Sequence, residues 1–322
     1  MRTSVLFVYF TFTILGCSQG QNESKNQALP PTNVIPVGKG PDALFLTPDE
    51  AFLYIANVED NHISVIDTRK DSVVQTIDTI DYPWGFTRLG HSNLVAVSGW
   101  DKGIDIIDFT SHQIVKSQRY SQNLGGITST SDGKIIFVVA TEENKVLKID
   151  TNSLVIKDEY ETGQGPDGIG ISKDEKKIYV TNTKEGTITI IDIEKKTSKK
   201  ITVGGKPELI HANEDRSILY ISNFFENKIH ILNTETDKLI HDITGLDCPE
   251  EVVLSKSGEK LYVVNFNSSQ VLTYSTKSYK KLGEVFVVGQ KPIGILTALN
   301  DSKLYVTNYG DNTVSVIVPN TQ

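Results

Sequence analysis

The fold of this chain is decided by the stretch GPDGIGISKDEKKIYVTN, residues 165–182, because varied copies of it recur along most of the sequence. The residue that ends the stretch has equivalents spaced 41 to 43 residues apart, at Asn57, Ser98, Ala140, Asn182, Asn223, Asn265 and Asn308. The residue that opens each copy keeps the same spacing, at Pro41, Pro83, Leu124, Pro166, Pro207, Pro249 and Pro292. Two independent markers with one period indicate seven repeats.

Each repeat contains four short strand patterns. Residues 178–181 and 187–191 are β-branched and aromatic, and a polar connection ending in Gly186 joins them, which predicts a hairpin. In other copies the turn position holds Asn61, Asn144, Asn227 and Asn312, a residue type able to adopt the left-handed conformation that the turn needs. One apolar segment follows each Pro and another follows the second strand of the hairpin, and no segment has a helical period. Four strands in each of seven repeats predict an all-β fold, a seven-bladed β-propeller with four antiparallel strands per blade.

The two ends of the repeat array indicate how the ring closes. The seventh repeat stops after its third strand, at residues 314–318, whereas the first repeat is preceded by a surplus apolar segment, residues 33–37. We expect residues 33–37 to form the missing fourth strand of the last blade. A closed ring has no internal boundary, so residues 33–319 are predicted to be one domain.

A targeting segment precedes the repeats. Arg2 is followed by an apolar run from Val5 to Leu15, which is shorter than the ~20 residues that span a bilayer. The run ends in Ile14-Leu15-Gly16-Cys17, which resembles a bacterial lipobox. This resemblance implies a signal peptide at residues 1–16, a lipid-modified Cys17 carrying diacylglycerol and palmitate, and a flexible tether over residues 17–32. The alternative is an ordinary secretory signal in which the Cys is incidental.

Composition excludes several classes of protein. The chain is 38% hydrophobic with a formal charge of −8, which argues against disorder and against nucleic-acid binding. The 6 His residues have no paired spacing, there is no Cys-x-x-Cys, and no Gly-rich phosphate loop leads into a helix. We therefore expect no metal and no cofactor. If Cys17 is acylated, Cys248 has no disulfide partner within the chain.

At the motif level the chain resembles a known family. Residues 179–182 and 305–308 both read Tyr-Val-Thr-Asn, and milder versions stand at 54–57, 220–223 and 262–265. With the preceding Gly-x-x-Pro and the period, they resemble the YVTN family of β-propeller repeats over about residues 33–318. The resemblance implies the fold strongly and the function weakly, since such propellers serve as surface proteins, as subunits of electron-transfer enzymes and in other roles.

Strand direction assigns loops to faces. The loop before each Pro and the hairpin after each Tyr-Val-Thr-Asn lie on one face, which we call the top face. The residues after each Pro should ring the mouth of the central channel, and they are Asp42, Trp84, Gly125, Asp167, Glu208, Glu250 and Ile293. Glu251 follows one of them, and Trp100 and Phe225 belong to hairpins of the same face. These acids and aromatics are the candidate binding residues, although charged loops and packed aromatics are also common without any ligand.

Two classes of function follow from this face, and a third function is a further alternative. The favoured one is a non-catalytic binding module that binds a protein or glycan ligand of positive charge. It would be a monomer on a lipid anchor in the bacterial envelope, and Ser18 after the Cys indicates the outer membrane. The alternative is a hydrolase resembling propeller lactonases, in which His211 and Arg88 would act with Glu208 and Glu250. The third is a periplasmic subunit of an electron-transfer complex. A hydrolase requires His211 and a carboxylate within hydrogen-bond reach of each other.

Overall fold

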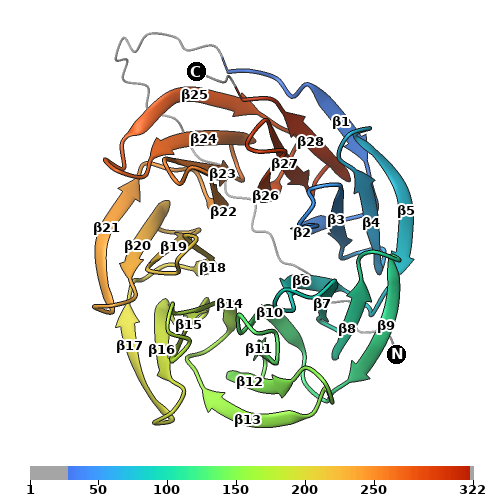
Figure 1. Cartoon of the computed structure of the whole chain (residues 1–322). Coiled ribbons are helices and arrows are strands. Elements are labelled where there is room, and N and C mark those ends of the chain that lie inside the picture. Colours follow the sequence, from blue (N-terminus) through green and yellow to red (C-terminus); the bar gives the residue numbers. More distant parts are fainter. Residues whose placement is uncertain (1–27, 320–322) are drawn as a thin grey trace, which may run out of the picture.

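The structure is a computed structural model, and it describes residues 28–319. These residues form seven four-stranded sheets around a central axis, and no helix occurs among them (Figure 1). The prediction of an all-β, seven-bladed propeller is confirmed. The predicted signal peptide, Cys17 and most of the predicted tether lie outside the described residues.

Each blade is a meander whose first strand lies next to the axis and whose last strand lies on the rim. Blades 1 to 3 contain β2 (Pro41–Leu46), β3 (Phe52–Asn57), β4 (His62–Asp67), β5 (Ser72–Asp78), β6 (Pro83–Arg88), β7 (Leu94–Gly99), β8 (Gly103–Asp108), β9 (Gln113–Arg119), β10 (Leu124–Ser129), β11 (Ile135–Ala140), β12 (Lys145–Asp150) and β13 (Ile156–Glu161).

Blades 4 to 7 repeat the same plan. They contain β14 (Pro166–Ile171), β15 (Lys177–Asn182), β16 (Thr187–Asp192), β17 (Thr197–Thr202), β18 (Pro207–Ala212), β19 (Ile218–Asn223), β20 (Lys228–Asn233), β21 (Lys238–Thr244), β22 (Pro249–Leu254), β23 (Lys260–Asn265), β24 (Gln270–Ser275), β25 (Lys281–Val287), β26 (Pro292–Ala298), β27 (Lys303–Asn308) and β28 (Thr313–Ile317).

The ring is closed by the N-terminal strand, as predicted. Strand β1 (Asn33–Pro36) pairs antiparallel with β28, with Asn33 opposite Val316 and Ile35 opposite Val314, and it completes the sheet β1-β28-β27-β26. Ile35 is 3% exposed and packs into the hydrophobic cluster between blades 7 and 1. Closure therefore joins the two ends of the chain by both backbone pairing and burial.

The chain already contacts the propeller before β1 begins. Leu29 forms a parallel bridge with Phe286, its N–H donates to the Val285 carbonyl at 2.9 Å, and its carbonyl accepts from Val287 N–H at 2.9 Å. Leu29 also packs against the cluster between blades 6 and 7. The segment in front of β1 thus covers the outer edge of blade 6, a use of strand pairing that protects an exposed edge.

One repeat marker is shifted by a residue relative to the sequence analysis. In blade 4 the register places Pro166 opposite Asn182, and in blade 2 it places Pro83 opposite Gly99. The structural equivalent of the Asn is therefore Gly99, and Ser98 corresponds to the Thr before it. The shift escaped detection because blade 2 lacks both the Tyr and the Asn that would have fixed the alignment.

The core consists of seams between blades. Seven hydrophobic clusters are present among the described residues, and each one joins two neighbouring blades, including blade 7 with blade 1. The Tyr of the motif lies in these seams and is fully buried at Tyr54, Tyr179, Tyr262 and Tyr305. Burial of apolar surface between blades, rather than within any one of them, stabilises the ring.

In three blades the hydroxyl group of the Tyr also joins the blade to the next one. Tyr179 of blade 4 donates to the Asp237 carboxylate of blade 5 at 2.7 Å, and Lys177 pairs with the same carboxylate at 2.8 Å. Tyr305 of blade 7 and Lys303 bond to Asp71 of blade 1 in the same way, at 2.6 and 2.7 Å. In blade 1 the Tyr54 hydroxyl meets His112 instead.

The Thr of the motif acts at the inner end of the seam. The Thr181 hydroxyl accepts from Gly168 N–H at 2.8 Å and donates to the Glu208 carbonyl of the next blade. Thr307 accepts from Gly294 N–H at 2.8 Å and donates to the Asp42 carbonyl at 2.8 Å. These carbonyls belong to mouth residues, so the motif holds the mouth in place.

The Asn closes the top hairpin. The Asn182 amide donates to the hydroxyls of Thr187 and Thr189 at 2.9 and 2.8 Å, and its oxygen accepts from Gly163 N–H at 3.0 Å. The predicted left-handed residue of the same hairpin is confirmed at four Asn positions, with φ of 56°, 56°, 55° and 56° at Asn61, Asn144, Asn227 and Asn312.

Candidate binding site at the channel mouth

A break in strand pairing exposes the mouth residues. In all seven blades the register between the first and second strands shifts just after the opening residue, for example between Pro207 and Ile210. A bulge redirects side chains and releases residues from the ladder. The residue after each Pro is therefore released from the ladder at the end of the strand that lies next to the channel.

Carboxylates from separate blades interact across this mouth. Burial, followed by the charges of Asp167 and Glu208, raises the pKa of Asp42 to about 7. Burial and the Glu208 charge raise the pKa of Asp167 to about 6, although Lys206 and a hydrogen bond from Trp84 partly oppose the rise. Asp42 stands on β2 and Asp167 on β14, three blades away, so the charge of Asp167 acts on Asp42 across the channel.

One lysine compensates part of this negative charge. The Lys206 ammonium group forms an ion pair with Glu208 and lies 5.2 Å from the centre of the Phe224 ring. Burial lowers the pKa of Lys206, but the carboxylates of Glu208, Glu250 and Asp167 outweigh it and leave the pKa above its usual value. The sequence analysis did not select Lys206, since a lysine before Pro-Glu has no distinctive signature.

Glu208 and Glu250 form a tight pair beside this lysine. The Glu208 side chain is 8% exposed, and its buried Oε2 has no hydrogen-bond partner among the described residues unless Glu250 carries a proton. Burial, then the Glu208 charge and a hydrogen bond to Glu208, hold the pKa of Glu250 well above its usual range. The Glu208 charge beside it therefore favours the protonated form of Glu250.

Glu251 lies beside the mouth, in the seam between blades 6 and 7. Its Oε2 accepts from Ile295 N–H at 3.0 Å, and burial raises the pKa of this carboxyl to about 8. The equivalent residue is Gly in four other blades, where a Cβ would meet the next strand; at Gly168 it would lie 2.1 Å from the Glu208 carbonyl oxygen. Glu251 therefore takes a place that most seams keep empty.

Tryptophans form one wall of the mouth. The rings of Trp84 and Trp100 lie 5.5 Å apart, and the Trp84 indole N–H bonds to Asp167, two blades away. Gly125, the mouth residue of the blade between them, lies next to Asp167, since a Cβ on it would be 3.9 Å from an Asp167 carboxylate oxygen, but it is the Val139 and Thr141 side chains, at 2.9 and 3.1 Å, that such a Cβ would crowd. Both tryptophans of the chain are thus at the mouth.

Phenylalanines form the opposite wall. Phe224 occupies the position in blade 5 that Trp100 occupies in blade 2, directly after the hairpin anchor, and it contacts Phe225 at 5.6 Å and Phe266 at 5.5 Å. Phe225 is 68% exposed, which is unusual for an aromatic side chain. The predicted aromatic character of the top face is therefore distributed on two sides of an acidic centre.

The residues of the hydrolase interpretation do not meet. Burial alone lowers the pKa of His211 to about 4, and no hydrogen bond or ion pair joins its imidazole to another residue of the described chain. Arg88 donates to the Ser92 carbonyl at 3.3 Å and lies 6.0 Å from the Phe109 ring centre. His211 is a neutral side chain of the inner strand β18, and the structure shows no base and carboxylate in contact there.

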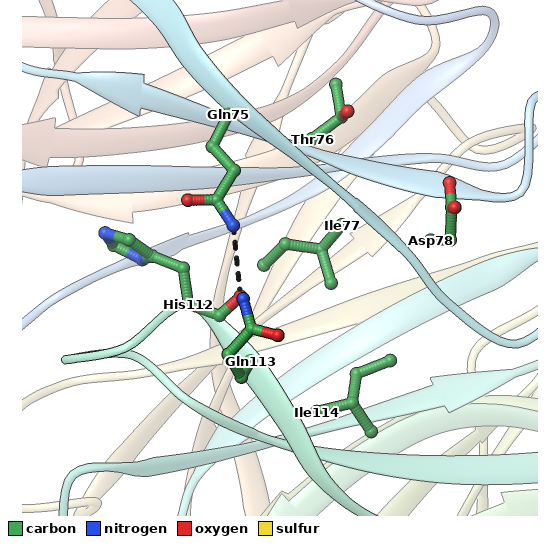
Figure 2. A pocket seen from close by; sticks show the side chains of 7 residues that line it. All are labelled: Gln75, Thr76, Ile77, Asp78, His112, Gln113 and Ile114. Carbon is green, nitrogen blue, oxygen red and sulfur yellow. Dashed lines mark hydrogen bonds between the residues drawn. The ribbon is translucent and has the colours of Figure 1, made fainter.

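Two further features concern possible sites elsewhere. Within residues 28–319 no group of three or more His, Cys, Asp or Glu side chains is arranged to hold a metal ion. A cavity of about 220 Å³ lies on the rim between β5 and β9, where Gln75 donates to the His112 carbonyl at 3.2 Å (Figure 2). The cavity is remote from the mouth, and its residues carry no periodic signal that the sequence analysis could have used.

Seven blades that position unlike side chains around one channel mouth define a β-propeller protein with an acidic and aromatic mouth. A model of the YNCE-like β-propeller family matches residues 24–303, and the chain belongs to this family. Its YVTN-type repeats are thus those of a YNCE-like propeller. Within residues 28–319, moreover, no helix has the length and apolar character needed to cross a membrane.

Known proteins resemble the chain over much of its length. Antigen Lp49 of Leptospira interrogans serogroup Icterohaemorrhagiae serovar copenhageni (strain Fiocruz L1-130) is 25% identical over 226 residues, which cover 66% of this chain and 49% of that protein. The chain therefore spans about half the length of this relative. A chain of the Kuenenia stuttgartiensis hydrazine synthase structure superposes with a TM-score of 0.78 at 17% identity, covering 95% of this chain and 100% of that one. At this identity the likeness concerns the fold.

Proposed function

We propose that this YNCE-like propeller is an envelope-anchored binding module whose channel mouth holds a positively charged segment of a protein or glycan partner. The observation that carries the proposal is the charge of the mouth. Asp42, Asp167, Glu208 and Glu250 converge on it, and Lys206 is the cation that reaches them in the described chain. Such a field attracts a cationic partner, and its effect weakens as salt rises.

The aromatic walls support binding rather than chemistry. Exposed Phe225 and the Trp84–Trp100 pair supply large apolar surfaces next to the charges, as binding sites for charged side chains do. The hydrolase alternative requires a contact between His211 and a carboxylate, and the described chain shows none. No observation in the described chain favours the electron-transfer subunit.

The proposal is tested with an immobilised lysine octapeptide as a defined cationic probe. We expect binding that weakens steeply with ionic strength and that is lost in Asp42→Asn with Asp167→Asn. Neutral substitutions are preferable to Glu208→Lys, which would place two ammonium groups together at a buried position. The matched control on the opposite side of the blades, Lys280→Glu with Lys281→Glu, should bind at least as well as the wild type. Loss of binding in this control, with retention in the mouth variant, contradicts the proposal.

Anchoring in the envelope, with attachment to the outer membrane, is the second half of the proposal. It rests on the lipobox-like residues before Cys17, which lie outside the described residues. Replacing Cys17 with Ser should release the protein from the membrane fraction into the soluble fraction of the envelope. Unchanged partitioning of the Cys17→Ser variant would remove the anchor from the proposal and leave the binding site unaffected.

A further inference from the structure

We propose that the rim of blade 1 is a docking site for an extended segment of a partner protein. The segment adds as a further strand to the free edge of β5 and places one aliphatic side chain in the cavity between β5 and β9. This surface lies on the outside of the ring, away from the channel mouth. The inference therefore goes beyond the proposed function and does not depend on it.

The chain itself shows this mode of binding on blade 6. Leu29 lies along the outer edge of β25, where its N–H donates to the Val285 carbonyl and its carbonyl accepts from Val287 N–H, both at 2.9 Å. It forms a bridge with Phe286, and its side chain packs against the cluster between blades 6 and 7. One aliphatic residue in an extended segment thus uses two backbone groups of a rim strand and one seam between blades.

Blade 1 has the same edge groups, and no residue of the described chain covers them. Strand register makes residues 76–78 of β5 equivalent to residues 285–287 of β25. In both blades the next residue donates its N–H to the top hairpin, so the two strands have the same hydrogen-bonding phase. Because the phase alternates along a strand, the Thr76 carbonyl and the Asp78 N–H point to the free edge, where Leu29 would meet their equivalents.

The cavity supplies a place for the side chain. It lies between residues 75–78 of β5 and residues 112–114 around the start of β9, and Ile77 and Ile114 are among the residues that line it (Figure 2). Ile77 is the equivalent of Phe286, which the blade 6 segment contacts. A volume of about 220 Å³ is below the ~300–1,000 Å³ of pockets that hold a whole small molecule. One aliphatic side chain on the strand edge is the better match.

β5 is also the rim strand with the least protection against strand addition. Exposed edges are usually blocked by charged residues, above all Lys, or by Pro. The other rim strands carry such residues: Lys116 and Arg119 in β9, Lys157 in β13, Lys199 and Lys200 in β17, Lys238 in β21, Lys281 in β25 and Pro36 in β1. β5 reads Ser-Val-Val-Gln-Thr-Ile-Asp, and Val74 in it is 47% exposed. An edge without Lys or Pro beside a cavity distinguishes blade 1.

The register also specifies the chemistry of the partner segment. In a parallel pair that places an aliphatic residue opposite Ile77, the next residue lies opposite Asp78. The Asp78 carboxylate is exposed and forms no ion pair within residues 28–319. A basic residue directly after the aliphatic one would stand beside this carboxylate, and opposite charges on neighbouring strands stabilise their pairing. The partner segment is therefore an extended strand in which an aliphatic residue precedes a basic one.

Fluorescence anisotropy of a labelled peptide, fluorescein-Gly-Ser-Val-Leu-Lys-Ser-amide, tests the site on the intact protein. We expect saturable binding. The same peptide with N-methyl-leucine lacks the N–H that would donate to the Thr76 carbonyl, so it should bind about fivefold or more weakly. The peptide with Ser in place of Leu lacks the side chain that fills the cavity and should bind about tenfold or more weakly. Both comparisons use the unaltered protein.

Variants of the protein test the same edge. Asp78→Pro removes the outward N–H without removing a bond of the ladder, and Pro36 already takes the equivalent position in blade 7. It should raise the dissociation constant about tenfold or more at an unchanged melting temperature, whereas Asp78→Asn, which keeps the N–H, should raise it about twofold. The matched control is Thr202→Pro, at the equivalent position of the lysine-bearing strand β17, and it should bind like the wild type.

The inference is overturned if the peptide does not bind saturably, if N-methylation has no effect, or if Thr202→Pro weakens binding as much as Asp78→Pro. Self-association of the protein alone that Asp78→Pro abolishes would assign the edge to a second copy and overturn the choice of a partner protein. Failure is separable from that of the proposed function, because Asp42→Asn with Asp167→Asn should leave binding of this peptide unchanged. Loss of peptide binding in that mouth variant would overturn the rim site and leave the octapeptide result intact.

Discussion

The seams and the mouth of this propeller follow opposite rules. At the seams, equivalent residues recur from blade to blade: Tyr179 and Tyr305 bond to Asp237 and Asp71, and Thr181 and Thr307 bond to the next inner strand. At the mouth, one structural position holds seven residues that include acids, a tryptophan, a glycine and an isoleucine. The residues that repeat hold the blades together, and the residues that vary at the position after each Pro form the candidate binding site.

The largest effect should come from breaking the one seam that depends on the chain terminus. We compare two proteins that begin at residue 28 and at residue 38. The shorter one lacks β1 and Leu29, and therefore the β28 pairing, the buried Ile35 side chain and the cover over β25. Its free energy of unfolding should fall by more than about 5 kcal/mol, given several lost backbone bonds and one buried aliphatic side chain.

Equilibrium denaturation of both proteins measures this difference. A third protein that begins at residue 18 serves as the control, and it should melt with the longer of the two. Equal stability of the proteins that begin at 28 and 38 would show that β1 does not hold the ring closed.

The next effect concerns an internal seam. Asp237 receives the Tyr179 hydroxyl at 2.7 Å, Lys177 at 2.8 Å and Lys199 at 2.9 Å, and its carboxylate is 10% exposed. Asp237→Ala leaves the half-buried Lys177 without its carboxylate and leaves the Tyr179 hydroxyl with the Thr234 carbonyl, at 3.0 Å, as its remaining acceptor, so we expect a loss of about 3 kcal/mol. In urea denaturation the control Asp192→Ala, whose pair with Lys195 is exposed, should lose less than about 1 kcal/mol. Similar losses in the two variants would show that the bonds to Asp237 do not hold blades 4 and 5 together.

The contribution of Asp237 to the free energy of unfolding should be sensitive to acid. Burial raises the pKa of Asp237, but the bonds from Lys177, Tyr179 and Lys199 outweigh it and leave the pKa below its ordinary value. Ionised Asp237 therefore contributes stability above the ordinary carboxyl pKa of about 4, and the contribution is lost as the pH falls through the lower, folded-state pKa. The difference between wild type and Asp237→Ala should shrink in that acidic range.

At the mouth, in contrast, removing a carboxylate should raise the free energy of unfolding. The pKa of Asp42 is raised to about 7 in the folded protein, so its protonated form is favoured there, and the associated stability is lost as the pH rises from about 4 through about 7. Asp42→Asn removes that loss. We expect the variant to match the wild type near pH 4 and to be more stable by about 1–2 kcal/mol at pH 8, a value reduced for solvent screening in the open mouth.

Melting temperatures across this pH range test the assignment. A variant that is less stable than the wild type at pH 8 would show that the Asp42 carboxylate is already compensated within the chain. A gain in stability together with lost binding of the lysine octapeptide would indicate that this acid is retained for the ligand rather than for the fold.

This contrast explains which features the sequence predicted. The blade count, the closing segment 33–37, the left-handed Asn positions and the identity of the mouth ring follow from periodicity, because equivalent positions in a propeller have equivalent surroundings. The Lys206 contact with Phe224, the reach of Trp84 to Asp167 and the place of Glu251 in a seam depend on bulges and on side-chain directions between blades. No spacing in one chain encodes these contacts.

The smallest effect should appear where seam and mouth meet. The Thr181 hydroxyl bonds to the backbone of Gly168 and to the carbonyl of Glu208, so a repeated residue of blade 4 positions an unrepeated residue of blade 5. Thr181→Val keeps the shape of the side chain and removes both bonds, and blades 3 and 6 already carry Val139 and Val264 at this position. We expect a stability loss of only about 1 kcal/mol, together with a shift in the Glu208 carboxylate that weakens binding of the lysine octapeptide by about twofold to fivefold. Urea denaturation and the octapeptide binding assay measure the two quantities on the same samples. If stability falls while octapeptide affinity stays at the wild-type value, the seam supports the ring without positioning the mouth, and the two regions are independent.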